Sequence, residues 1–161
     1  MPEKKTIKRA QRDKREGKAP TTQAGEFVRE EIEHIREGKH GARNAKQAIA
    51  IGLSKARRAG VDLPAPKRGS RALKKQAARD SARSPKKKVS RTRSRATTKA
   101  LRREGTSAAS PTAMARQTRT ASKRRTASER SAAARKAVRT KGPTKRKAAA
   151  RKAARTRAKR V

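Results

Sequence analysis

The fold of the N-terminal part is decided by residues 25–37, which read GEFVREEIEHIRE. Val28, Ile32 and Ile35 follow one another at spacings of four and three residues, so they share one side of an α-helix. This spacing predicts a helix over residues 25–37 that buries its apolar stripe. Gly38 is a typical stop, because glycine adopts the left-handed conformation at a helix end without strain.

A second helix is predicted to follow Asn44, a favoured N-cap residue with Gln47 three positions later. Gly60 is expected to end this helix. Small residues recur at helical spacing and would let the two helices approach closely: Ala45, Ala48, Gly52 and Ala56. We therefore expect a helical hairpin domain over residues 21–66, with a core of Val28, Ile32, Ile35, Ile49 and Leu53.

Four glutamates of the first helix form a second stripe: Glu26, Glu30, Glu33 and Glu37. At 100° per residue they fall within a narrow arc that faces away from the apolar side. A solvated helix face is the ordinary interpretation of such a pattern. The alternative is an acidic surface that binds a basic protein or competes with DNA for the basic tail.

Residues 1–20 form a charged N-terminal segment in which Ile7 is the only large apolar side chain. We expect no more than a short helix that ends near Gly17, followed by a break at Pro20. A domain of roughly 60 residues or fewer is marginally stable alone. Self-association or a protein partner bound through the hairpin is therefore a further expectation.

Residues 67–161 hold 35 Lys and Arg against three acids, and their few large apolar residues are scattered. Such a segment repels itself and cannot build a core. The sequence AAARKA occurs at residues 132–137 and again at 148–153, and we expect these copies to become helical only on a polyanion. The predicted fold class is a small all-α helical hairpin followed by a long, largely disordered basic tail.

A polycation of this size requires a polyanion. Duplex DNA carries one phosphate charge per roughly 1.7 Å, so the excess charge of the tail matches about 16 base pairs. We expect non-sequence-specific binding of duplex DNA and histone-like compaction of a nucleoid in the cytoplasm. The predicted contacts are Lys86, Lys87, Lys88, Arg91, Arg93, Arg95, Lys123, Arg124, Arg125, Arg135, Lys136, Lys145, Arg146, Lys147, Arg151, Lys152, Arg155, Arg157, Lys159 and Arg160.

Other classes of function have weaker support in the sequence. The only aromatic residue is Phe27, so base stacking is not favoured, although binding of structured RNA or of a ribosome stays open. An interaction protein that the tail merely anchors to nucleic acid is a third alternative. We expect no enzyme, no cofactor and no small-molecule substrate. With no Cys and only His34 and His40, no metal site is expected, and no apolar stretch is long enough for membrane insertion.

Two resemblances add to this interpretation. Residues 22–41, TQAGEFVREEIEHIREGKHG, and residues 46–60, KQAIAIGLSKARRAG, resemble a family of small uncharacterised bacterial proteins. This resemblance covers roughly residues 1–66 and implies no activity, although members of that family often bear Lys- and Ala-rich tails. The region from Lys67 onward resembles the tails of linker histones and of bacterial histone-like nucleoid proteins, including the S-P-K-K element at residues 84–87. That resemblance implies DNA compaction.

Overall fold

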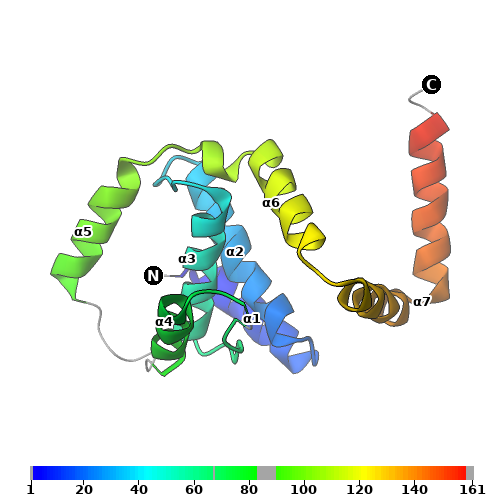
Figure 1. Ribbon diagram of the computed structural model, residues 1–161, viewed down its shortest axis with the longest axis horizontal. Coiled ribbons are helices and arrows are strands. Elements are labelled where there is room, and N and C mark those ends of the chain that lie inside the picture. The colour runs from blue at the N-terminus through cyan, green and yellow to red at the C-terminus, as the bar shows by residue number, and fades with distance from the viewer. Residues whose placement is uncertain (1, 67, 83–89, 159–161) are drawn as a thin grey trace. The chain divides into compact units, whose positions relative to one another are not determined.

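The computed structural model describes residues 2–66, 68–82 and 90–158, and every regular element in these ranges is a helix (Figure 1). In chain order the elements are α1 (Lys4–Arg15), α2 (Pro20–Arg36), α3 (Ala45–Arg58), α4 (Arg71–Ala82), α5 (Arg91–Arg102), the 3₁₀-helix η1 (Ser107–Ala109), α6 (Pro111–Lys123) and α7 (Ala127–Ala158). The chain divides into two compact units, Met1–Gln117 and Thr118–Val161.

The predicted fold class, a single hairpin followed by a disordered tail, is wrong. The described part of the chain after residue 66 contains α4, α5, η1, α6 and α7. These helices are rich in Ala, Arg and Lys, which favour helix, and capping residues start α4, α6 and α7. Ser70 Oγ accepts a hydrogen bond from Leu73 N–H at 3.2 Å, and Ser110 Oγ accepts one from Ala113 N–H at 3.2 Å. Local propensity and caps therefore outweigh the charge repulsion from which disorder is predicted.

The N-terminal charged segment forms a full helix, α1, which packs against α2 and makes the expected hairpin a three-helix bundle (Figure 1). Ala10 is buried at the contact, and Ile7 packs against the same cluster. Beyond α1, Gly17 has a φ of 68°. A single large apolar side chain is sufficient here, because the small Ala10 lies one turn further along the same side.

Helix α2 begins at Pro20, five residues earlier than its apolar stripe predicts. Proline fits the first position of a helix because no hydrogen bond is required of its nitrogen there. At the other end the predicted stop is confirmed. Gly38 has a φ of 73°, its N–H donates to the carbonyl of Ile35 at 3.1 Å, and Lys39 N–H donates to the carbonyl of His34 at 3.0 Å. This pair of bonds is the Schellman pattern.

Both predicted ends of α3 are confirmed. Asn44 Oδ1 accepts a hydrogen bond from Gln47 N–H at 3.0 Å, which caps the first turn. After the helix, Gly60 has a φ of 88° and Val61 N–H donates to the carbonyl of Ala56 at 3.1 Å. Val61 and Ala56 belong to one buried cluster, so the hydrophobic contact that accompanies such a stop is also present.

The small residues of α3 face α2, as their spacing predicts. Gly52 is buried, and a Cβ added to it would lie 2.7 Å from the Cα of Val28. No side chain fits at that distance, so the two backbones touch at this point. Ala45, Ala48 and Ala56 are buried on the same side of α3.

The core consists of two clusters rather than one. The first joins α1, α2, α3 and the segment after α3, and contains Ala10, Ala24, Phe27, Ala56, Val61 and Leu63, with Leu53 packed against it. The second contains Ile35, Ala42, Ala48, Ala108 and Ala109, with Ile32 packed against it. Ala108 and Ala109 belong to η1, so the region expected to be a tail supplies part of the N-terminal core.

Two main-chain hydrogen bonds and one from a side chain attach the end of α5, the segment after it and η1 to the bundle. Gly41 N–H donates to the carbonyl of Leu101 at 2.9 Å, and Ala42 N–H donates to that of Gly105 at 3.1 Å. Arg36 Nε donates to the carbonyl of Ala109 at 2.8 Å. A Cβ at Gly41 would overlap the backbone carbonyl of Glu104, so this contact requires glycine.

The second unit is built from the end of α6 and from α7, and none of the described residues in α7 is buried. Gly142, with φ 67° and ψ 170°, interrupts α7, and Pro143 follows it. Each AAARKA copy therefore lies in its own half of α7, one before and one after this kink. No helix among the described residues is long and apolar enough to cross a membrane.

Candidate nucleic-acid interface

Helix α5 presents a row of positive charge on one side. Arg91, Arg95, Lys99 and Arg102 occur at spacings of four, four and three residues, which places them within an arc of about 80°. Ser94 and Thr98 border this row, and together with Arg95, Lys99, Arg102 and Arg103 they line an open hollow along the helix. We call Arg91, Arg95, Lys99 and Arg102 the α5 stripe. A row of cations flanked by hydroxyl groups is suited to phosphate oxygens.

Helix α7 is capped at its start by Thr126 and Glu129. Thr126 Oγ1 accepts a hydrogen bond from Glu129 N–H at 3.1 Å, and Glu129 Oε2 accepts one from Thr126 N–H at 2.8 Å. These reciprocal bonds form a capping box, which the spacing T-x-x-E would have revealed. Glu129 is the only acid in α7, and its charge is favourable at a helix N-terminus.

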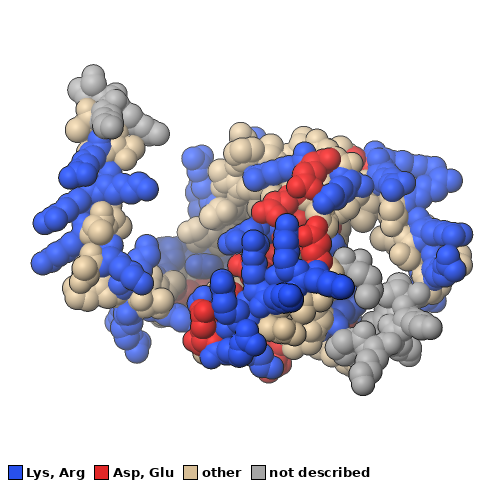
Figure 2. All heavy atoms as spheres, turned by 180° about the vertical axis from the view of Figure 1, so that it is seen from behind, with Lys and Arg blue, Asp and Glu red and all other residues tan. Residues whose placement is uncertain are grey.

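The charges of α7 lie on all sides of the helix. The part after the kink, residues 143–158, reads PTKRKAAARKAARTRA and contains no acid. At 100° per residue its Lys and Arg side chains point in every direction around the axis. Figure 2 shows these side chains projecting on both sides of that segment, which ends in the grey C-terminal residues. A helix with no uncharged side has no surface to bury against protein.

The structure describes 15 of the predicted contact residues, and all of them are exposed. Arg91, Arg93 and Arg95 lie in α5, and Lys123 ends α6. Arg124 and Arg125 lie between α6 and α7, and the others lie in α7. Lys86, Lys87, Lys88, Lys159 and Arg160 lie outside the described residues, as does the S-P-K-K element at residues 84–87.

Two members of the α5 stripe, Lys99 and Arg102, are absent from the predicted contacts. The signal that finds them is the spacing 91, 95, 99, 102, which becomes meaningful only when the segment is helical. Arg93, which is among the predicted contacts, points away from the stripe at this periodicity. The expectation of disorder therefore concealed the arrangement of these cations.

Two basic residues of α3, Arg57 and Arg58, are engaged within the protein. Arg57 is buried, and its guanidinium donates to the carbonyls of Leu63 at 3.4 Å and Pro64 at 3.2 Å. Arg58 lies 3.9 Å from the carboxylate of Asp80 in α4. Both side chains hold the segment after α3 against the bundle and are not aligned for a ligand.

The four glutamates of the predicted acidic stripe, three in α2 and Glu37 directly after it, do not share a solvated face. Glu30 is buried, and its Oε2 accepts a hydrogen bond from Glu3 N–H at 3.1 Å. Glu26 lies 3.7 Å from Arg9 of α1. Glu33 and Glu37 are exposed, and a hydrogen bond from Lys39 lowers the pKa of Glu37. The interpretation as one solvated face is wrong for Glu30, because α1 and the N-terminal residues pack over that side of α2.

Comparison with known proteins extends only to the N-terminal part. Residues 3–68 match the model of a family of unknown function, DUF6496. No curated protein and no solved structure shows significant similarity to the chain. The first 68 residues are thus similar to an uncharacterised family, and the match covers α1, α2 and α3 but none of the exposed basic helices.

Proposed function

We propose that this protein binds duplex DNA without sequence specificity, through the α5 stripe and α7, and that it compacts the DNA by neutralising phosphates. The observation that carries the proposal is α7, a helix with twelve Lys and Arg, one acid and no buried residue. A helix that repels itself and buries none of its described residues gains most from a partner of opposite charge. Release of the counterions condensed on DNA supplies the driving force.

The spacing of the charges suits a nucleic-acid backbone. After the kink, the helical residues of α7 span about 24 Å at 1.5 Å per residue. Seven cations over that length give about one per 3.4 Å, which is the spacing of phosphates along one strand of B-DNA. The small Ala side chains between the cations allow close approach of the helix to the sugar-phosphate surface.

The same residues favour binding without base readout. Lys and Arg on all sides of α7 contact phosphates at any register, whereas specific readout needs a few side chains aimed at base edges. The chain has no Trp or Tyr, and its single Phe, Phe27, is buried in the bundle. Aromatic stacking on single-stranded bases is therefore not available.

A charge-matched pair of variants of the full chain tests the proposal. The first replaces five exposed cations of α7 with Gln: Lys145, Arg146, Lys147, Arg151 and Lys152. The second replaces five exposed cations of the bundle with Gln: Lys4, Lys8, Lys14, Arg15 and Lys46. Each phosphate contact contributes about 0.9 to the slope of log affinity against log salt concentration. We expect the first variant to lose about 4 to 5 units of slope and the second to lose far less.

Binding is measured by fluorescence anisotropy on duplex DNA, duplex RNA and single-stranded DNA of equal length. Equal losses from both variants would mean that net charge alone governs binding and would contradict the role given to α7. Tighter binding of duplex RNA than of duplex DNA would contradict the choice of DNA. Atomic force microscopy of long DNA, with and without protein, measures compaction directly.

A further inference from the structure

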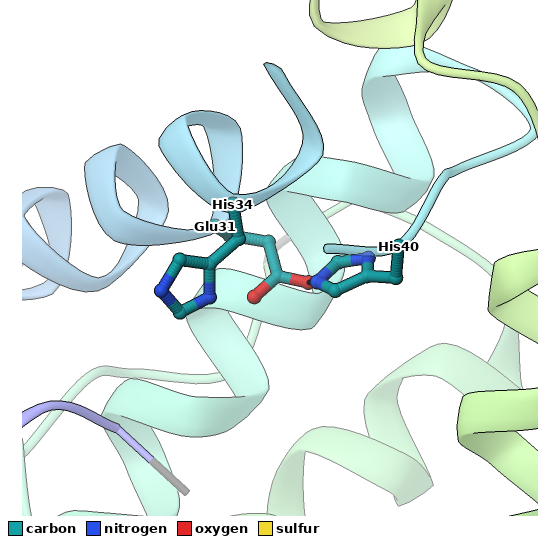
Figure 3. A group of neighbouring side chains, drawn as sticks. All are labelled: Glu31, His34 and His40. Carbon is teal, nitrogen blue, oxygen red and sulfur yellow. Dashed lines mark ion pairs between the residues drawn. The ribbon is translucent and has the colours of Figure 1, made fainter. Parts of the chain in front are cut away.

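Three side chains with metal-binding atoms meet at the C-terminal end of α2 (Figure 3). They are Glu31 and His34 of α2 and His40 of the following loop, and one potential ligand atom from each lies within 4.8 Å of the others. Glu31 and His34 are three residues apart, so they share one side of the helix. The turn at Gly38 then brings His40 back toward them, with the two imidazole rings on either side of the carboxylate.

The carboxylate of Glu31 is buried and incompletely paired. Its side chain is 1% exposed, and Oε1 has no hydrogen-bond partner. Lys55 of α3 contacts the other oxygen, Oε2. Burying a carboxylate oxygen without a partner costs free energy of folding. A cation or a hydrogen-bond donor that faces Oε1 would remove this cost.

His40 is oriented as a metal ligand would be. Its Nδ1 lies 3.1 Å from the carbonyl oxygen of Gly41, which can only accept a hydrogen bond, so Nδ1 carries a proton. The lone pair of a neutral ring is then on Nε2, and Nε2 lies 3.3 Å from Glu31 Oε1. Two ligands held at about 2.0–2.1 Å from a tetrahedral ion are about 3.3 Å apart, so this distance is that of neighbouring ligands of one zinc ion.

The ring of His34 is also oriented by a hydrogen bond from its second nitrogen. Its Nε2 lies 2.9 Å from Glu3 Oε1, so the ring donates to the carboxylate and keeps its lone pair on Nδ1. Metal-binding histidines generally donate their second nitrogen to a carboxylate or a carbonyl, and this cluster contains one example of each.

We propose that Glu31 Oε1, His34 Nδ1 and His40 Nε2 bind one divalent transition-metal ion of the zinc class, with water as the fourth ligand. Imidazole nitrogens exclude Mg²⁺ and Ca²⁺ as preferred occupants, since those ions select oxygen ligands. The third ligand atom lies within 4.8 Å, so it must approach by at most about 1.5 Å to reach ligand spacing. The ion would fix the loop after α2. In that loop the N–H groups of Gly41 and Ala42 donate to the carbonyls of residues 101 and 105.

The composition of the chain makes this proposal simple to test. The chain contains no Cys, and both of its His residues belong to this cluster. Zinc that binds through imidazole must therefore bind here. Full-length protein freed of metal with EDTA is titrated with Co²⁺, followed by visible absorption, and with Zn²⁺, followed by calorimetry. We expect one ion per chain. Long-range ¹H–¹⁵N spectra should show that Zn²⁺ shifts Nδ1 of His34 and Nε2 of His40.

Variants identify the ligands. His34→Gln, His40→Gln and Glu31→Gln should each weaken Zn²⁺ binding by at least about tenfold. Glu33→Gln makes the same charge change as Glu31→Gln on an exposed side of α2 and should bind as the parent does. Circular dichroism checks that each variant is folded, and the two His variants decide the result if Glu31→Gln is not. Absence of a one-to-one complex, unshifted imidazole nitrogens, or His variants that bind as the parent does would each overturn the proposal.

Discussion

Helix α3 and the second half of α7 are both short and rich in Ala, Lys and Arg, yet they are stabilised in different ways. The small residues Ala45, Ala48, Gly52 and Ala56 of α3 recur at spacings of three and four and form one buried side against α2. The alanines in the second half of α7 include the runs 148–150 and 153–154 between cations, so no side of that helix is free of charge, and none of its described residues is buried. The arrangement of the same residue types therefore decides whether a helix depends on packing or on local propensity alone.

The largest expected effect comes from placing a charge in each region. Ile35 is fully buried in the second cluster, and Ile35→Asp would insert an unpaired carboxylate there. The cost of several kcal/mol approaches the whole stability of a small domain. We expect loss of the cooperative urea transition of the bundle, followed by circular dichroism.

Val138→Asp in α7 is the matched control, because Val138 is 44% exposed. It should leave the bundle transition unchanged. If both variants unfolded the bundle equally, α7 would contribute to the core and the contrast between the two helices would not hold.

A smaller effect is expected from adding a methyl group to one glycine of each region. Gly52→Ala would place a Cβ 2.7 Å from the Cα of Val28, so the backbones of α2 and α3 must separate. Overpacking of this kind costs about 1–3 kcal/mol, more than the roughly 1 kcal/mol gained in helix propensity. We expect a lower urea midpoint for the bundle with an unchanged slope.

Gly142→Ala meets no atom within 4 Å, and its cost is the strain of a left-handed φ of 67°. That strain of about 1–3 kcal/mol is local and should be relieved by a change at the kink. The urea midpoint of the bundle should stay at the parental value, and a shift equal to that of Gly52→Ala would show that the kink is coupled to the core.

The smallest effect is expected from removing the N-cap of each helix. Asn44→Ala removes the cap of α3, and Thr126→Ala removes that of α7. Each loss is about 1 kcal/mol for the helix concerned. We expect Asn44→Ala to lower the stability of the whole bundle, since α3 is packed into it, and Thr126→Ala to increase amide exchange only in the first turns of α7. Hydrogen exchange followed by NMR measures both, and protection lost beyond α7 in Thr126→Ala would contradict the independence of that helix.

The parts of the fold that local patterns specify are the parts that the sequence predicts. The stops at Gly38 and Gly60, the cap at Asn44 and the close approach at Gly52 each depend on a few neighbouring residues. The position of η1 in the core depends instead on Ala108 and Ala109, two small residues in a basic segment. Nothing in their immediate surroundings distinguishes them from the exposed alanines of α7, because their burial results from contacts with residues at least 60 positions away.

The metal-binding cluster illustrates the same limit. From the composition no metal site is expected, but the structure places the carboxylate of Glu31 beside His34 and His40. The spacing Glu31-x-x-His34 marks a shared helix side, whereas the return of His40 depends on the turn at Gly38. The orientation of both rings depends further on Glu3 and on the carbonyl of Gly41, neither of which can be read from spacing.

The contact between Arg36 and Ala109 also affects how the protein folds during synthesis, because 73 positions separate its partners. The bundle helices α1, α2 and α3 are complete at Arg58, but the second cluster is not closed until Ala109 has been added. At about 5–20 residues per second, the roughly 50 intervening residues take about 3–10 s to translate. During those seconds the apolar end of the nascent bundle around Ile35 is uncovered, and its association with other chains competes with folding.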